Sequence, residues 1–128
     1  MPARILLGVL ATFLGLNGLV MLAAPLPWYD AVPGVTATGA FNPHFVRDIG
    51  AAYLVTAGGT GWEAARPVQG WPALVGAAAF LTAHAAIHVF DAACGASPLA
   101  DVLRDLPGVY APSIVAAAVA TLTRHKGA

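Results

Sequence analysis

The feature that most constrains this chain is a long apolar run near its start. Residues 5–24 contain no charged side chain. The hydrocarbon core of a bilayer is about 30 Å thick, and about 20 helical residues are needed to cross it. The run therefore predicts a transmembrane helix. A cleaved signal peptide is the alternative, because Arg4 precedes the run and Leu22-Ala23-Ala24 resembles a cleavage site. Pro25 follows that site directly and argues against cleavage, so we expect the helix to be retained.

Charged side chains are too scarce to cover a soluble domain of this size. Of the 128 residues, 59% are hydrophobic and 9% are charged, whereas a soluble domain usually carries about a quarter charged residues. The formal net charge is zero and no basic run is present, so no nucleic-acid partner is expected. The one cysteine, Cys94, excludes an intrachain disulfide and is assigned no role. The expected partner is the lipid bilayer.

Three further segments have the apolar composition of membrane helices. Asn42-Pro43 is a typical helix start, with Asn as the cap and Pro in the first turn. The connections are rich in turn-forming residues, and Ser97-Pro98 predicts a short amphipathic helix lying at the membrane surface. The predicted fold class is all-α: an integral membrane four-helix bundle with up-down antiparallel topology. One domain covers residues 1–128, with spans at about 5–24, 43–62, 72–93 and 109–124.

The distribution of basic residues predicts the orientation. Four spans would place both termini and the turn at 63–70 on one side of the membrane. Arg4, Arg66, Arg124 and Lys126 lie on that side, against Arg47 and Arg104 on the other. By the positive-inside rule, the termini face the cytoplasm.

Ionisable side chains interrupt two of these apolar segments. The stretch Thr82–Asp91 places His84, His88 and Asp91 at positions i, i+4 and i+7, which share one helical face. His44 and Asp48 form a similar pair at i and i+4. Burying ionisable groups without partners is expensive. We therefore expect the two clusters to face each other.

Counting the helical rise from the outer ends of the spans places both clusters in the outer half of the membrane. His44 and Asp91 would lie within about 3 Å of the boundary, Asp48 and His88 at about 7 Å, and His84 at about 13 Å. Antiparallel neighbours would then hold Asp48 and His88 within hydrogen-bonding or shared-ligand reach.

Two other polar residues at this level have structural interpretations. Asn17, at a depth of about 10 Å by the same rise, is expected to form an interhelical hydrogen bond rather than to bind a ligand. Arg47 is expected to pair with Asp91 or to extend its side chain to the surface.

Imidazole together with carboxylate is the ligand set of zinc, iron and copper sites. The three histidines would coordinate the ion, and a carboxylate would complete the shell or orient a histidine. An open coordination position would make the site catalytic and a closed shell would make it structural, so an enzymatic role stays open. The predicted function is a metal-binding membrane protein, with a redox or metal-handling role. The candidate metal ligands are His44, Asp48, His84, His88 and Asp91.

Other functions remain open. The chain could be an accessory or scaffold subunit, in a homo-oligomer or a larger membrane complex, with a purely structural polar cluster. It could also bind haem through two histidines on separate helices, or relay protons. A single haem would use two of the three histidines, however, and would not explain the carboxylates. A proton-coupled transporter is disfavoured because four spans leave little room for a pathway.

A resemblance to known proteins is carried by residues 28–50, Trp-Tyr-Asp-Ala-Val-Pro-Gly-Val-Thr-Ala-Thr-Gly-Ala-Phe-Asn-Pro-His-Phe-Val-Arg-Asp-Ile-Gly. This stretch resembles small bacterial four-span membrane proteins, and the general layout is similar to the DoxX-like group. The resemblance implies a four-helix membrane bundle in the bacterial inner membrane, associated with respiratory or redox membranes. It implies no particular site residues.

Overall fold

Proline marks where nearly every helix begins. Pro lacks a backbone N–H and has a fixed φ, so it is favoured in the first helical turn and disfavoured further along. The computed structural model describes residues 2–95 and 98–123, and these residues contain no strand. The all-α fold class is therefore confirmed for them. The helices are α1 (Pro2–Ala23), α2 (Pro25–Ala31), α3 (Pro43–Ala65), α4 (Trp71–Cys94), α5 (Pro98–Asp105) and α6 (Ala111–Leu122), with a short 3-10 turn at Val35–Ala37 and a π-helical segment at Leu106–Tyr110.

Local sequence signals predicted most helix boundaries well. The Asn42 side chain accepts hydrogen bonds from the backbone N–H groups of His44 and Phe45, at 3.0 and 3.2 Å, which confirms the predicted cap. The short helix expected after Ser97-Pro98 is α5, although Ser97 itself lies outside the described residues. It belongs to the continuous apolar stretch Pro98–Leu122, which begins before the span predicted at about 109–124, so its place at the membrane surface stays a prediction. Two basic residues used for the orientation, Arg124 and Lys126, also lie outside the described residues.

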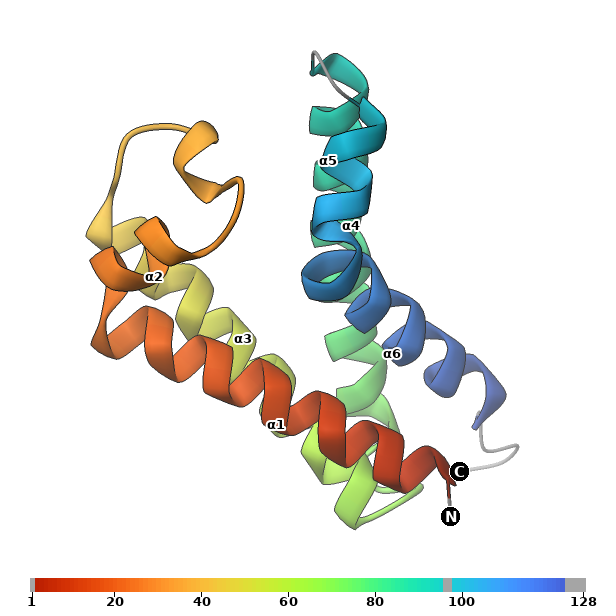
Figure 1. The fold of residues 1–128 in the computed structure, drawn as a ribbon. Helices are drawn as coiled ribbons and strands as arrows, with labels where there is room; N and C mark the ends of the chain where they lie inside the picture. The colour runs from red at the N-terminus through yellow and green to blue at the C-terminus, as the bar shows by residue number, and fades with distance from the viewer. Residues whose placement is uncertain (1, 96–97, 124–128) are drawn as a thin grey trace.

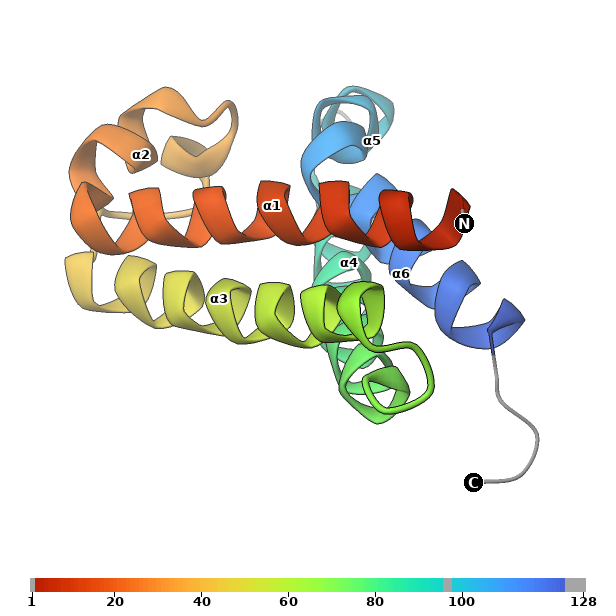
Figure 2. The ribbon, with the colours of Figure 1, turned by 90° about the horizontal axis from the view of Figure 1, so that it is seen from below.

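The first arm of the molecule is α1, α2, α3 and the loop that joins α2 to α3. Figure 2 shows α1 and α3 running side by side in opposite directions. Glycine permits this close approach: a Cβ on Gly50 would lie 2.8 Å from the Cβ of Met21 and 3.0 Å from the carbonyl oxygen of Gly18. At the other end of the pair, Arg4 Nε donates to the carbonyl oxygen of Ala64, at 2.8 Å.

The second arm is α4, α5, the π-helical segment and α6. Trp71 Nε1, at the start of α4, donates to the carbonyl oxygen of Ala120 near the end of α6, at 2.9 Å. Midway along, the hydroxyl of Ser113 donates to that of Thr82, at 3.3 Å. α5 lies against the far end of α4 (Figure 1). The segment from α5 to α6 therefore runs back along the whole length of α4.

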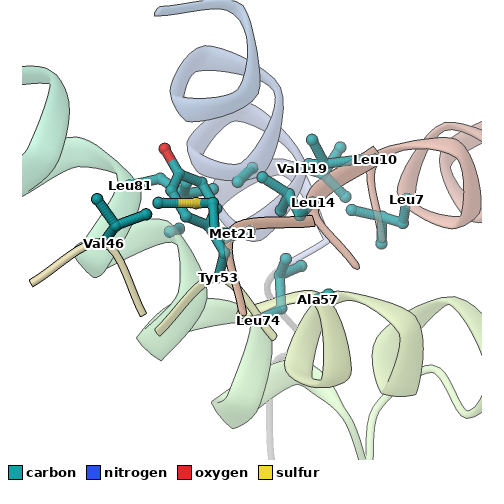
Figure 3. Close-up of a cluster of buried hydrophobic side chains, with 13 residues drawn as sticks. Leu7, Leu10, Leu14, Met21, Val46, Tyr53, Ala57, Leu74, Leu81 and Val119 are labelled. Carbon is teal, nitrogen blue, oxygen red and sulfur yellow. The ribbon is translucent and has the colours of Figure 1, made fainter. Parts of the chain in front are cut away.

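The two arms meet in one apolar core. Leu14 of α1, Leu74 of α4 and Ala116 of α6 are fully buried there. Figure 3 shows side chains from α1, α3, α4 and α6 converging on this point. The ring of Tyr53, on α3, meets Phe80 of α4 edge-on, with centroids 6.0 Å apart.

Beyond that contact, α3 and α4 diverge instead of continuing side by side. Figure 1 shows the start of α3 beside α2, while the end of α4 lies beside α5 in the other arm. The physical reason is that each of the two helices packs on a different neighbour at this end. The first half of α3 packs on α1 through Gly50, and the end of α4 packs on α5. The described helices thus form two crossed pairs, α1 with α3 and α4 with α6, and the up-down antiparallel four-helix bundle expected from the sequence stays a prediction.

Three helical segments are long and apolar enough to cross a membrane: Pro2–Ala23, Trp71–Cys94 and the continuous stretch Pro98–Leu122. They indicate an integral membrane protein. The outward face of α1 agrees, because large apolar side chains such as Ile5 and Val9 are exposed on it, and lipid would cover them. Among the described residues α3 is not one of these segments, so its span stays a prediction.

Candidate polar site at the end of the second arm

Two histidines stand one turn apart near the end of α4. The ring centroids of His84 and His88 are 4.8 Å apart, with the rings inclined at 68°. This proximity follows from their spacing in the sequence, since residues i and i+4 share a helical face. The sequence therefore predicted their neighbourhood correctly.

A short polar contact of the site joins α4 to α5. His88 Nδ1 lies 2.7 Å from Asp105 Oδ2, and the two side chains are only 28% and 10% exposed. An ionised carboxylate can only accept hydrogen bonds, so Nδ1 is the nitrogen that carries the proton in this pair. In the neutral ring, Nε2 then keeps its lone pair.

Arg104 is the positively charged partner of Asp105. Its Nε and Nη2 donate to the two oxygens of Asp105, at 2.8 and 3.2 Å, and its Nη1 donates to Asp101 Oδ1, at 2.7 Å. A guanidinium that bridges two carboxylates in this way is held in one orientation. Asp105 thus accepts from both Arg104 and His88, which links the surface of α5 to the histidine pair.

His84 has mainly aromatic neighbours. Its ring stacks on Phe80 at a centroid distance of 6.1 Å and an angle of 12°, and meets Tyr53 edge-on at 5.9 Å. Within residues 2–95 and 98–123, no protein group forms a hydrogen bond with its ring nitrogens. The His84 ring is therefore positioned by aromatic contacts with Phe80 and Tyr53, and its nitrogens can bind a ligand.

Tyr110 places one more polar group near the site. Its hydroxyl oxygen is buried and finds no hydrogen-bond partner among the described residues. The residue ends the π-helical segment Leu106–Tyr110, a rare conformation that is often found at functional sites. A buried hydroxyl without a partner is unfavourable unless a water molecule or ligand satisfies it.

The structure does not bring the two predicted clusters together, which corrects the expected pairing of Asp48 with His88. His44 Nε2 instead lies 3.3 Å from Asp48 Oδ2 of the same helix, and these side chains are 86% and 61% exposed. His88 pairs with Asp105, and Asp91 is exposed. The error came from assuming that α3 and α4 remain neighbours to their outer ends.

The two secondary expectations had different outcomes. Asn17 does form an interhelical hydrogen bond, because its Oδ1 accepts from Trp28 Nε1 of α2 at 2.9 Å. Of the two alternatives for Arg47, the pairing with Asp91 is not found and the exposed position is: the side chain is exposed, and its Nε donates to the backbone carbonyl of Leu22 at 3.4 Å.

Asp105 and Arg104 are the site residues that the sequence analysis missed. A usable signal was present: Asp101, Arg104 and Asp105 share one face of α5, while Leu99 and Leu103 are exposed apolar residues. A helix with one polar face, joined by a short connection to a segment with half-buried histidines, is a natural source of their partners.

The described residues 2–95 and 98–123 contain no group of three or more His, Cys, Asp or Glu side chains placed to hold a metal ion. What the site offers is two adjacent imidazoles, with a carboxylate bound to one of them. Comparison of the chain with protein-family models, curated proteins and solved structures finds no match.

Proposed function

We propose that this protein is an integral membrane protein that binds a transition-metal ion, copper, iron or zinc, through His84 and His88. The observation that carries the proposal is the 2.7 Å contact between His88 Nδ1 and Asp105. Histidines that bind metals usually donate the other ring N–H to a carboxylate, which fixes the tautomer and strengthens the ligand. His88 is arranged in this way, with Nε2 left for an ion.

His84 is the natural second ligand. It lies one turn from His88, with its ring 4.8 Å away between centroids. Two imidazoles at i and i+4 on a helix can share one ion with bonds of about 2.0–2.1 Å. Apart from His88, its described ring neighbours are aromatic side chains, so an ion would not have to displace another partner.

Two protein ligands leave coordination positions open for water, a substrate or a second carrier. Such a site suits redox chemistry or metal handling better than a closed structural site. His44, Asp48 and Asp91 have no part in this version of the site. A haem would need a second axial ligand on another helix, and His44 pairs with Asp48 instead.

The membrane setting is part of the same proposal. α3 joins the three apolar segments as a fourth membrane helix in a distorted up-down bundle, with cytoplasmic termini. The resemblance of residues 28–50 to small bacterial four-span proteins, and of the layout to the DoxX-like group, favours the bacterial inner membrane and an association with redox membranes.

Metal analysis of detergent-purified protein tests the proposal. The wild type, loaded in turn with copper, iron or zinc and then desalted, should retain about one equivalent of one of these ions. His84→Ala and His88→Ala should lose it, and Asp105→Asn should weaken binding about 10- to 100-fold. His44→Ala is the matched control, because this histidine pairs with a carboxylate outside the site. No retained ion in the wild type, or equal loss in His44→Ala, would overturn the proposal.

A second candidate is an accessory or scaffold subunit of a homo-oligomer or larger complex. It is favoured by the way that Arg104, Asp105 and His88 fasten α5 to α4, which gives the cluster a purely structural use. Copurification of a stable larger assembly without metal would support it. A Soret band in the same sample would instead support haem.

A further inference from the structure

The loop between α2 and α3 touches the polar site from the other arm. Gly34 in this loop has a φ of +87°, and a Cβ built there would overlap the Nε and Cζ atoms of Arg104. Glycine is required at this position for two reasons: the left-handed backbone and the guanidinium that lies against it. The contact joins the loop of the first arm to α5 of the second through the Arg104 side chain, and Figure 1 shows the backbones of the two arms apart at this end.

Contacts with Tyr29 of α2, and one within the loop, hold the shape of the loop. The Tyr29 hydroxyl donates to the carbonyl oxygen of Gly39, and the rings of Tyr29 and Phe41 lie 5.3 Å apart between centroids. The hydroxyl of Thr38 donates to the carbonyl oxygen of Val35, at 2.7 Å. The loop can therefore dock on α5 as a preformed unit.

Arg104 connects this docking to the histidines. The Nε and Cζ atoms of Arg104 lie against Gly34. The Arg104 Nε donates a hydrogen bond to Asp105, and Asp105 accepts one from His88 Nδ1. These direct contacts form a continuous series from the loop, through Arg104 and Asp105 of α5, to His88 of α4.

We infer that residues 32–41 form a strap whose docking on Arg104 through Gly34 keeps Asp105 in place for His88. Arg104 is a positioning residue: it touches no ligand and acts through Asp105. When the strap is docked, His88 is held as the Nδ1–H tautomer with Nε2 free. When the strap lifts, Arg104 loses its contact with Gly34 and keeps only its contacts with Asp101 and Asp105, so the carboxylate that fixes this tautomer is held less firmly.

Distance measurements between spin labels test the docking step. Labels at Thr36→Cys and Leu103→Cys, two exposed positions on the loop and α5, would be placed in a Cys94→Ser background because Cys94 is a free, exposed thiol. The parent should give one narrow distance distribution. Gly34→Val should give a longer and broader one, since its side chain would collide with Arg104.

Gly39→Val is the matched control for backbone strain. Gly39 also has a positive φ, of +148°, but a Cβ there would have nothing within 4 Å. It should leave the distance distribution narrow. Equal broadening in Gly39→Val and Gly34→Val, or no broadening in either, would overturn the strap.

The coupling to His88 has its own readout, which does not need a metal. Nitrogen-15 NMR of labelled histidine should show His88 as the Nδ1–H tautomer in the parent, and a mixture of tautomers in Gly34→Val and Arg104→Gln. Arg104→Ala removes the collision as well as the link, so adding Gly34→Val to it should change the histidine spectrum no further. A His88 spectrum that stays unchanged while the loop distance shifts would overturn the coupling.

Metal affinity gives a third measurement, which rests on the proposed function. Gly34→Val should weaken binding several-fold, in the direction of Asp105→Asn. Failure of the wild type to bind metal, with the expected spin-label and NMR results, would overturn the proposed function and leave the strap supported.

Discussion

Among the residues that the structure describes, histidine pairs with aspartate twice, once in each arm, and the two pairs differ in almost every physical respect. The first joins His44 to Asp48, one turn apart on α3, at 3.3 Å with 86% and 61% of the side chains exposed. The second joins His88 of α4 to Asp105 of α5, at 2.7 Å with 28% and 10% exposed. The first pair is created by local helix geometry, and the second by the packing of two helices.

The comparison shows that residue type and spacing do not decide whether such a pair matters. Exposed ion pairs contribute about 0–1 kcal/mol because solvent screens them and their side chains lose entropy. A buried pair is costly to break, since the surviving partner keeps its desolvation penalty. The second pair is therefore the one expected to influence stability and chemistry.

The largest expected effect is that of removing Asp105. Asp105→Ala leaves His88 Nδ1 without its acceptor and Arg104 without its two-point contact, so we expect it to lower the free energy of unfolding by about 2–3 kcal/mol. Unfolding by SDS titration, followed by tryptophan fluorescence, measures this. A loss below about 0.5 kcal/mol, the range of an ordinary surface substitution, would mean that the two pairings are energetically alike.

The next effect tests whether the first arm depends on backbone packing rather than on polar pairs. A Cβ on Gly50 would collide with Met21 and with the backbone of Gly18, so Gly50→Ala should destabilise the protein by about 1–2 kcal/mol through overpacking. The same SDS titration measures the change.

Gly58 on the same helix provides the control. A Cβ there would meet nothing within 4 Å, and replacing an open helical glycine by alanine should stabilise the chain by about 0.5–1 kcal/mol. If Gly50→Ala were also stabilising, α1 and α3 would not be held in close contact through this glycine.

These contrasts explain how much the sequence could predict. The cap at Asn42, the pairing of His84 with His88 on one face and the hydrogen bonding of Asn17 depend on local helix geometry or on the need to satisfy a polar group in an apolar span. Each was predicted from the chain alone. The all-α class followed from the long apolar segments in the same way.

The partner of His88 could not be predicted by the same means. Asp105 lies 17 residues further along the chain, beyond a connection whose geometry depends on how α5 packs. Counting the helical rise placed Asp48 at the same membrane depth as His88, but two residues at the same depth need not lie on neighbouring helices. The close contact of α3 with α1 at Gly50 draws the start of α3 away from α4, and only the three-dimensional packing reveals this.

The smallest expected effect belongs to the exposed pair, and it is the sharpest test of the comparison. Asp48→Ala removes the carboxylate next to His44, and the SDS titration should show a loss of no more than about 0.5 kcal/mol. The helix cap does not depend on it, because Asn42 satisfies the backbone of His44 and Phe45. A loss near that of Asp105→Ala would show that the start of α3 is covered in the membrane, by lipid or by a second copy of the chain. The His44–Asp48 pair would then be a buried pair. Burial, rather than position in the fold, would still decide how much a histidine–aspartate pair contributes to the free energy of unfolding.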